Sequence, residues 1–265
     1  MNFRPPPIVP KPPFCSATIC RHDYAAPTKP LVTAPGMVAR THRGNFMADY
    51  TLSETTVISA RVSLLRFAEI PNEYSIPGQF LAVSVQDAKP SWFAIASSPG
   101  EPLELLIKAG GTVADSLCAM QVGEVATAGE AMGKGFAIQD RSRPLVCLIN
   151  GTGVSAVRPV IRAELAAGLP RPVHLLYGVH FAEDFAFVDD MTAWKAAGVS
   201  VVQIVGAGGG DLQGLRGWVQ DHAQGLGLVQ DDVDLLLCGV REMAQAALAL
   251  YSDAGLAADR VLTNY

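Results

Sequence analysis

Two hydrophobic patterns follow each other along this chain of 265 residues, and the change between them constrains the fold more than any other feature. Before residue 140, short alternating apolar runs are separated by Gly and Pro. After residue 144, nearly continuous apolar runs alternate with segments of helical period. The first pattern is typical of a small antiparallel β-barrel, and the second of βαβ units on a parallel sheet. We therefore predict two folded domains, 48–140 and 141–265, with the boundary near the polar stretch 139–143.

The barrel domain is predicted to contain short strands and a single helix. Val113, Leu117 and Met120 recur at helical spacing, which indicates a helix over 112–121 that Thr112 can cap. The alternating, β-branched runs between turn residues predict strands at 55–65, 79–85, 92–97, 103–109 and 124–129.

The second half of the chain is predicted to alternate strands with helices. A Gly-rich turn at 151–153 opens into the first helix, and Gly255 ends the last one. The continuous apolar strands fit a sheet that is covered on both faces. We predict strands at 144–150, 172–178, 199–205, 233–239 and 260–265, and helices within 154–168, 187–198, 214–225 and 241–255.

The first 47 residues have a composition of their own. They contain six basic residues, one acidic residue and nine of the eighteen prolines. A segment so rich in proline and so poor in apolar pattern cannot bury enough surface to fold. Its basic, acidic-poor composition matches a transit peptide, and abundant proline favours the chloroplast over the mitochondrion. The alternative is a disordered tail without a targeting role.

The composition of the whole chain argues against several classes of protein. A net charge of −5 argues against a nucleic-acid surface. No apolar run reaches the roughly 18 residues of a transmembrane helix. The five cysteines are scattered and form neither a CxxC pair nor a Cys/His cluster, which argues against a disulfide framework, a zinc site and an iron–sulfur centre.

Glycine turns mark the places where we expect a ligand. Ligands of parallel α/β sheets bind beyond the carboxyl ends of the strands, and three predicted ends carry glycine, at 150–154, 177–180 and 238–239. In the barrel, residues 108–112 lead through two glycines into the predicted helix, where backbone amides can approach a phosphate. For each turn taken alone the alternative is an ordinary turn, and Cys238 alone can be a buried apolar residue.

The order of these features resembles the ferredoxin–NADP reductase-like superfamily. The chain contains, in sequence, WFAIAS (92–97), GGT (110–112), GxxxGxGF (129–136), GTG (151–153), YG (177–178) and CGxxxM (238–243). The resemblance covers about residues 50–265 and is greatest to plant plastid FAD/NAD(P)-binding oxidoreductase-like proteins of the kiwifruit ripening-associated type. It implies an antiparallel β-barrel that binds a flavin, followed by an α/β parallel-sheet domain that binds a nicotinamide nucleotide.

The resemblance implies a flavin-dependent NAD(P)H oxidoreductase with FAD and NAD(P)H as cofactors. Hydride would pass from the nicotinamide C4 to the flavin N5, and electrons would go on to an unknown acceptor. His180 alone is a weak reader of a 2′-phosphate, so NADH and NADPH both stay open. Ser91 stands where the family has Arg, and Ala94 where it has Ser or Thr. These departures keep a second hypothesis open, a redox-inactive nucleotide-sensing or assembly subunit.

The resemblance also implies roles for individual residues. Phe93 takes the position of the aromatic residue that packs on the flavin, and Cys238 that of a thiol against the nicotinamide. Tyr265, the last residue, takes the position of a terminal aromatic that covers the flavin, with a frayed end as the alternative. The other implied cofactor contacts are Ala94, Ile95, Ala96, Ser97, Lys108, Gly110, Gly111, Thr112, Val113, Gly151, Thr152, Gly153, Val154, Tyr177, Gly178, His180, Gly239 and Met243.

Overall fold

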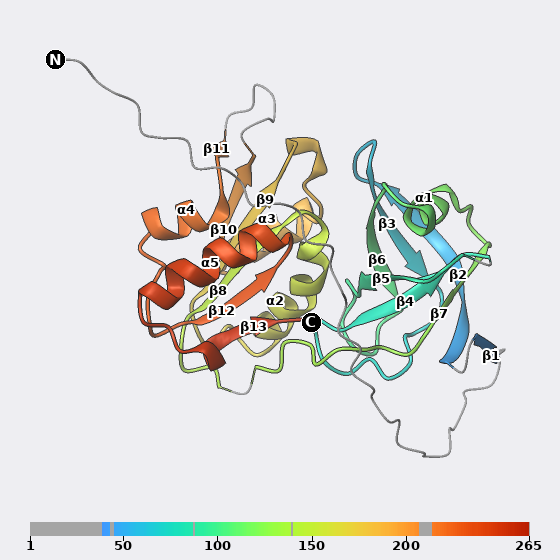
Figure 1. The fold of residues 1–265 in the computed structure, drawn as a ribbon, viewed down its shortest axis with the longest axis horizontal. Coiled ribbons are helices and arrows are strands. Elements are labelled where there is room, and N and C mark those ends of the chain that lie inside the picture. The colour runs from blue at the N-terminus through green and yellow to red at the C-terminus, as the bar shows by residue number, and fades with distance from the viewer. Residues whose placement is uncertain (1–38, 43–44, 87, 139, 207–213, 265) are drawn as a thin grey trace, which may run out of the picture. The chain divides into compact units, whose positions relative to one another are not determined.

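A computed structural model describes residues 39–42, 45–86, 88–138, 140–206 and 214–264. An antiparallel barrel comes first along the chain and a parallel sheet with helices follows it (Figure 1), so the predicted fold class is confirmed. The predicted transit peptide up to residue 38 and the predicted flavin cover Tyr265 lie outside the described residues. No helix in the described ranges is both long enough and apolar enough to span a membrane.

The barrel is one antiparallel sheet in the order β5-β4-β7-β2-β3-β6, with β1 paired to β2. A bridge between Ile95 and Leu105 joins the two ends of this order and closes the barrel. Its elements are β1 (Ala39–His42), β2 (Asn45–Val57), β3 (Val62–Phe67), β4 (Phe80–Ser84), β5 (Ser91–Ala94), β6 (Glu104–Lys108), α1 (Thr112–Ala119) and β7 (Val125–Ala128).

The start of the barrel differs from the sequence prediction. β1 and the first residues of β2 lie inside the segment 1–47 that we predicted to be disordered. The single strand predicted at 55–65 is two strands, because the chain turns back at 58–61. In this turn the amide of Ile58 donates to the carbonyl of Val62 at 2.9 Å. The turn contains no Gly or Pro, so the pattern of breaker residues does not reveal it.

The second domain is a parallel sheet in the order β11-β10-β9-β8-β12-β13. The chain starts at β8, moves outward on one side to β11, and returns to β12 on the other side. β8 and β12 therefore form the switch point, where an open crevice is expected beyond the strand ends. The strands are β8 (Leu145–Asn150), β9 (Val173–Val179), β10 (Ser200–Val205), β11 (Leu215–Arg216), β12 (Asp234–Cys238) and β13 (Val261–Thr263).

Helices cover both faces of this sheet (Figure 1). Apolar residues of α2 and α3 pack into one core, which also takes in Val62, Ala96 and Leu106 of the barrel. Residues of α4 and α5 pack into the core on the other face. The helices are η1 (Gly151–Gly153), α2 (Val154–Ala166), η2 (Ala182–Asp184), α3 (Val188–Ala196), α4 (Val219–Gly225), α5 (Arg241–Asp253) and η3 (Ala258–Arg260).

One predicted helix of this domain begins later than expected. The segment 214–225 starts with β11, whose Leu215 pairs with Ile204 of β10, and only then becomes α4. Gly217 separates the two elements at a φ of 114°. The apolar and polar residues of 214–218 fit either period, so the sheet edge decides the outcome.

Three arginine–carboxylate pairs join the barrel to the α/β domain. Arg61 in the turn after β2 binds Asp184 of η2 at 2.7 Å. Arg158 of α2 binds Glu104 of β6, and one turn later Arg162 binds Glu101 through two bonds of 2.7 and 2.8 Å. The pairs hold the barrel strand β6 beside the start of α2, next to the turns predicted to bind a nucleotide.

Candidate functional site

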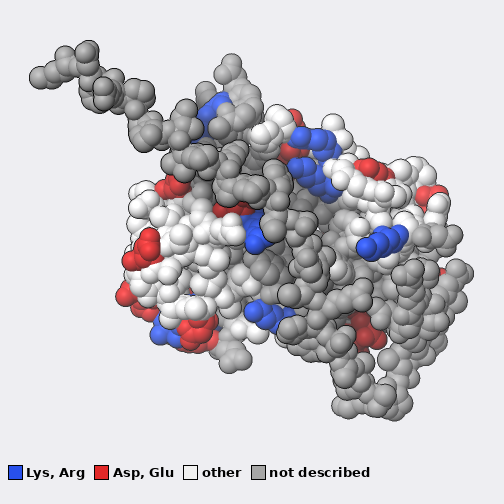
Figure 2. Space-filling model, in the orientation of Figure 1, with Lys and Arg blue, Asp and Glu red and all other residues white. Residues whose placement is uncertain are grey.

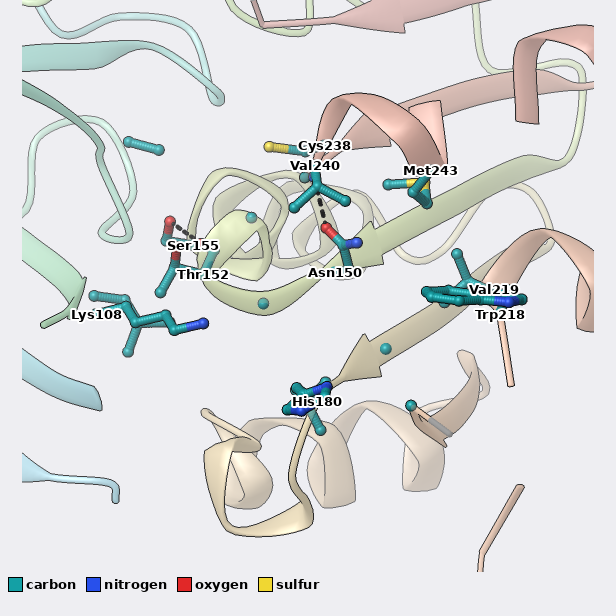
Figure 3. A pocket seen from close by; sticks show the side chains of 18 of the residues that line it. Lys108, Asn150, Thr152, Ser155, His180, Trp218, Val219, Cys238, Val240 and Met243 are labelled. Carbon is teal, nitrogen blue, oxygen red and sulfur yellow. Dashed lines mark hydrogen bonds between the residues drawn. The ribbon is translucent and has the colours of Figure 1, made fainter. Parts of the chain in front are cut away.

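A cavity of about 600 Å³ lies where residues of the barrel meet the edge of the parallel sheet. Figure 3 shows Lys108 of β6 on one side of it, Trp218 and Val219 on the opposite side, and His180 at the end of β9. Backbone and side chains at the carboxyl ends of β8 and β12 form a further wall. Because Phe93 and Ala94 of β5 also line this cavity, it contains residues of both predicted cofactor sites.

The turns after β8 and β12 are packed directly on each other. The side-chain oxygen of Asn150, Oδ1, accepts the amide of Val240 at 2.8 Å (Figure 3). A Cβ added to Gly239, whose φ is 150°, would lie 1.8 Å from that oxygen. A Cβ added to Gly153 would lie 2.6 Å from the carbonyl oxygen of Cys238. Glycine at 153 and 239 thus permits a close approach that no other residue allows.

Cys238 ends β12 at the wall of the cavity, and its side chain is almost buried. Its thiol donates to the Oδ1 of Asn264, in the chain that follows β13, over 3.8 Å. Burial raises the pKa of the thiol to about 12, because the thiolate would lose its hydration there. Cys238 is therefore a neutral thiol at physiological pH, suited to contact with a flat apolar ring rather than to nucleophilic attack.

We expect Cys238 to resist alkylation in the folded protein. At a pKa of about 12, roughly one thiol in ten thousand is ionised near pH 8. Iodoacetamide labelling followed by peptide mass spectrometry should find Cys238 unmodified in the native protein and fully modified in guanidinium. Labelling should rise steeply with pH above 10. Fast labelling of native Cys238 near pH 8 would contradict the buried position.

A second hollow, of about 410 Å³, borders β5 and the start of α1. Ser91, Trp92 and Phe93 line it on one side, and the backbone of 110–114 on the other. The predicted cap of α1 is wrong here: Thr112 makes no capping hydrogen bond with its side chain. Asp115 reaches back instead, and its carboxylate accepts the amides of Gly110 and Gly111 at 2.8 and 3.3 Å.

The structure brings most of the predicted site residues to these two hollows. The larger cavity contains Phe93, Ala94, Lys108, Gly151, Thr152, Gly153, Gly178, His180, Cys238, Gly239 and Met243. The smaller one contains Phe93 again, with Gly110, Gly111, Thr112 and Val113. Phe93 is thus the predicted residue that borders both.

Five predicted contact residues are not brought to either hollow. Their side chains are 1% exposed or less and pack in the core of the barrel or of the α/β domain. These residues are Ile95, Ala96, Ser97, Val154 and Tyr177. A sequence motif contains both lining residues and the residues behind them, and only the direction of each side chain separates the two.

Several lining residues of the larger cavity were not among the predicted contact residues, and four of them shape it most directly. Trp92 and Trp218 line it although 73% and 59% of their surfaces are exposed. Asn150 and Val240 form the bond between the two glycine turns. In the sequence Trp218 directly follows Gly217, and a large aromatic residue at a glycine turn is a usable signal, because exposed aromatic residues often meet a ligand or partner. No local pattern identifies Asn150, whose partner is 90 positions away.

The residues of the larger cavity fit two flat rings and a phosphate. Phe93 and Trp92 offer aromatic faces, and Gly151–Gly153 forms the start of a helical segment whose first amides lack helical acceptors. The smaller hollow fits a flavin phosphate less well, since a carboxylate already takes two of its amides.

Metal chemistry and a strongly charged surface find no support in the described residues. Within those ranges, no three His, Cys, Asp or Glu side chains gather as a metal site would require. Figure 2 shows basic and acidic side chains interspersed on the face that it displays, without an extended field of one sign among the coloured residues.

Comparisons with known proteins agree with this geometry. Residues 148–248 match the family model of the oxidoreductase NAD-binding domain. The chain is 28% identical to the fruit protein pKIWI502 of Actinidia deliciosa, over 60% of the chain and 56% of that protein. It is 29% identical to the ferredoxin–NAD(+) reductase component of the alkene monooxygenase system of Xanthobacter autotrophicus, over 53% of the chain and 45% of that protein.

The chain thus spans about half the length of these curated relatives. Among solved structures, a ferredoxin NADP+ reductase from Neisseria gonorrhoeae with bound FAD and NADP has the same fold, with a TM-score of 0.70 and 16% identity. The match covers 82% of this chain and 97% of that one. With the barrel, the parallel sheet and the NAD-binding match taken together, the chain has the two-domain fold of the ferredoxin–NADP reductase-like proteins, and its second domain matches the oxidoreductase NAD-binding domain.

Proposed function

We propose that the protein is a flavin-dependent NAD(P)H oxidoreductase that delivers electrons to a protein acceptor. One observation carries the proposal: Phe93 and Ala94 of the barrel share a single cavity with the turns 151–153 and 238–239 of the parallel sheet. When bound there, a nicotinamide supplies a hydride and a flavin accepts it. Such a transfer needs both rings in one enclosure, which separate pockets on the two domains would not provide.

The residues of the cavity have distinct roles in this proposal. Phe93 packs against the flavin ring, and Lys108, which has no ion-pair partner among the described residues, supplies positive charge beside the nucleotide. The amides at the start of η1 bind a coenzyme phosphate. The neutral thiol of Cys238 packs against the nicotinamide, and the bond from Asn150 to Val240 fixes the wall behind it.

The first test uses the colour and reduction of the purified protein. A yellow protein whose visible flavin absorbance disappears on anaerobic addition of NADH or NADPH supports the oxidoreductase. The coenzyme that acts at lower concentration identifies the preference. A colourless protein that takes up no added flavin contradicts it.

A second function is favoured by specific departures from the family pattern at β5. Ser91 and Ala94 lack the charge and hydroxyl of the family pattern, and Asp115 occupies two amides of the smaller hollow. A protein with these features can keep the nucleotide site and lose the redox step, as a nucleotide-sensing or assembly subunit. It would bind NAD(P)H by calorimetry and remain colourless with added flavin.

Ser91→Arg should tighten FAD binding. Ser91 lines the smaller hollow, opposite the glycine turn that the sequence predicts to approach a phosphate, and an arginine there can make charge-assisted bonds. A hydrogen bond to a charged group contributes about 1.5–3 kcal/mol, which corresponds to roughly one to two orders of magnitude in the dissociation constant. Fluorescence titration measures the change, with Ser91→Met as the uncharged control of similar length. Equal or weaker affinity for Ser91→Arg would show that β5 does not bind the cofactor as proposed.

A further inference from the structure

The start of α1 is closed by a side chain of the same helix. The Asp115 carboxylate accepts the Gly110 amide at 2.8 Å and the Gly111 amide at 3.3 Å. The amide of Asp115 in turn donates to the carbonyl of Gly111 at 2.8 Å. These three bonds fold residues 110–115 into a closed loop in which the amides of Gly110 and Gly111 are already paired with a carboxylate.

This loop forms one wall of the smaller hollow, which borders β5. Gly110, Gly111 and Thr112 line the hollow opposite Ser91 and Phe93. A phosphate that binds the amides of Gly110 or Gly111 in this hollow must displace the Asp115 carboxylate from them or lie next to it. Either course is unfavourable, because displacement breaks two charge-assisted bonds and proximity places like charges together.

The hollow has little positive charge to offset that carboxylate. Of the side chains that line it, only Lys89 is basic, and Ser91 is neutral. Lys89 has no ion-pair partner among the described residues, so it is free to approach a phosphate. One lysine against one carboxylate leaves no net positive charge for the two charges of a pyrophosphate.

We propose that Asp115 is a specificity-determining residue: it makes the protein hold a flavin by its ring and gain no affinity from the flavin phosphates. The inference rests on the proposed flavin function and deepens it. The ring contacts at Phe93 and Trp92 do not involve Asp115, so riboflavin, FMN and FAD should bind with dissociation constants within about three-fold of one another. A flavin held in this way exchanges readily with free flavin.

Titration of the purified full-length protein with each of the three flavins tests this proposal. Quenching of flavin fluorescence gives the dissociation constants without any need for turnover. Asp115→Asn keeps the size of the side chain and removes its charge. It should tighten FAD and FMN at least about five-fold and change riboflavin less than about two-fold. The preference for FAD over riboflavin in Asp115→Asn should fall with added salt, because it then depends on Lys89.

The controls separate this effect from general charge and from folding. Asp189→Asn removes an exposed carboxylate from the first turn of α3, a matched position outside the hollow, and should change no flavin affinity. Asp115→Ala, with thermal unfolding measured in parallel, should repeat the selective gain for FAD.

Two results would overturn the proposal while leaving the flavin function intact. One is a wild-type protein that binds FAD far more tightly than riboflavin. The other is an Asp115→Asn protein in which all three affinities change alike or none changes. If neither protein binds any of the three flavins, the proposed oxidoreductase function fails together with this inference.

Discussion

Gly153→Ala should weaken NAD(P)H binding about ten-fold or more and lower the free energy of unfolding by about 1–3 kcal/mol. The backbone of Gly153 is helical, with φ −58° and ψ −20°, so alanine itself is not strained there. Its Cβ, however, would lie 2.6 Å from the carbonyl oxygen and 2.9 Å from the carbonyl carbon of Cys238. Backbone atoms cannot rotate away, so η1 must move off β12 and carry the phosphate-binding amides with it.

Calorimetric titration with NADH and NADPH measures the loss of affinity, and denaturant unfolding measures the loss of stability. Gly225→Ala is the matched control: Gly225 ends α4, has an ordinary φ, and an added Cβ there meets no atom within 4 Å. It should leave both quantities unchanged. Unaltered coenzyme affinity in Gly153→Ala, with Gly225→Ala as reference, would show that the coenzyme does not bind at this turn.

Gly239, in the turn that faces Gly153, cannot be replaced by a larger residue either. Its φ of 150° and the 1.8 Å approach of an added Cβ to Asn150 Oδ1 both require glycine. Asn150, at the end of β8, thereby joins the two turns at the switch point of the sheet. The geometry explains why both turns of this wall carry glycine. The two backbones are in direct contact, and a side chain between them would separate β8 from β12 at their carboxyl ends.

The fold could be predicted from the sequence because its signals are local. The alternation before residue 140 reflects strands with one buried face, and the continuous apolar runs after residue 144 reflect strands that helices cover on both faces. The glycine turns were also predictable, since strand ends in a parallel sheet meet at one edge. For that reason Gly151–Gly153 and Cys238–Gly239 were expected together, and the structure places both turns on one cavity.

The contacts that shape the site could not be predicted, because their partners are distant or compete with one another. Asn150 is a polar residue at a strand end, and nothing near it in the sequence points to Val240. Asp115 lies four residues after Gly111, close enough to be considered, yet Thr112 has the more usual capping position. The turn at 58–61 contains no breaker residue. Its Ser59 and Arg61 side chains instead bind Asp184, a residue more than 120 positions away in the sequence, which no local pattern reveals.

Arg158→Met should give the largest loss of stability among the charged residues that join the two domains, about 2–4 kcal/mol. The Arg158 side chain is 13% exposed and its partner Glu104 6%. The same guanidinium binds Asp190, donates to the carbonyl of Ala96 at 3.2 Å and lies 4.4 Å from the ring centre of Phe187. Methionine keeps part of the packing but leaves Glu104 with Arg66 as its remaining ion-pair partner among the described residues.

Arg162→Met is the control for Arg158→Met, because it lies one turn further along α2 and also joins the barrel. Arg162 and Glu101 are 36% and 41% exposed, so solvent screens their pair and the expected loss is about 1 kcal/mol or less. Denaturant unfolding of both variants gives the comparison, and a double mutant with Glu104→Gln isolates the Arg158 pair. If the protein acts as proposed, Arg158→Met should also slow the reduction of the flavin by NAD(P)H more than it weakens coenzyme binding. The substitution loosens β6 against α2 and leaves the turn proposed to bind the coenzyme phosphate unchanged. Equal stability of the two variants would mean that apolar packing, and not the buried pair, holds the barrel on the α/β domain.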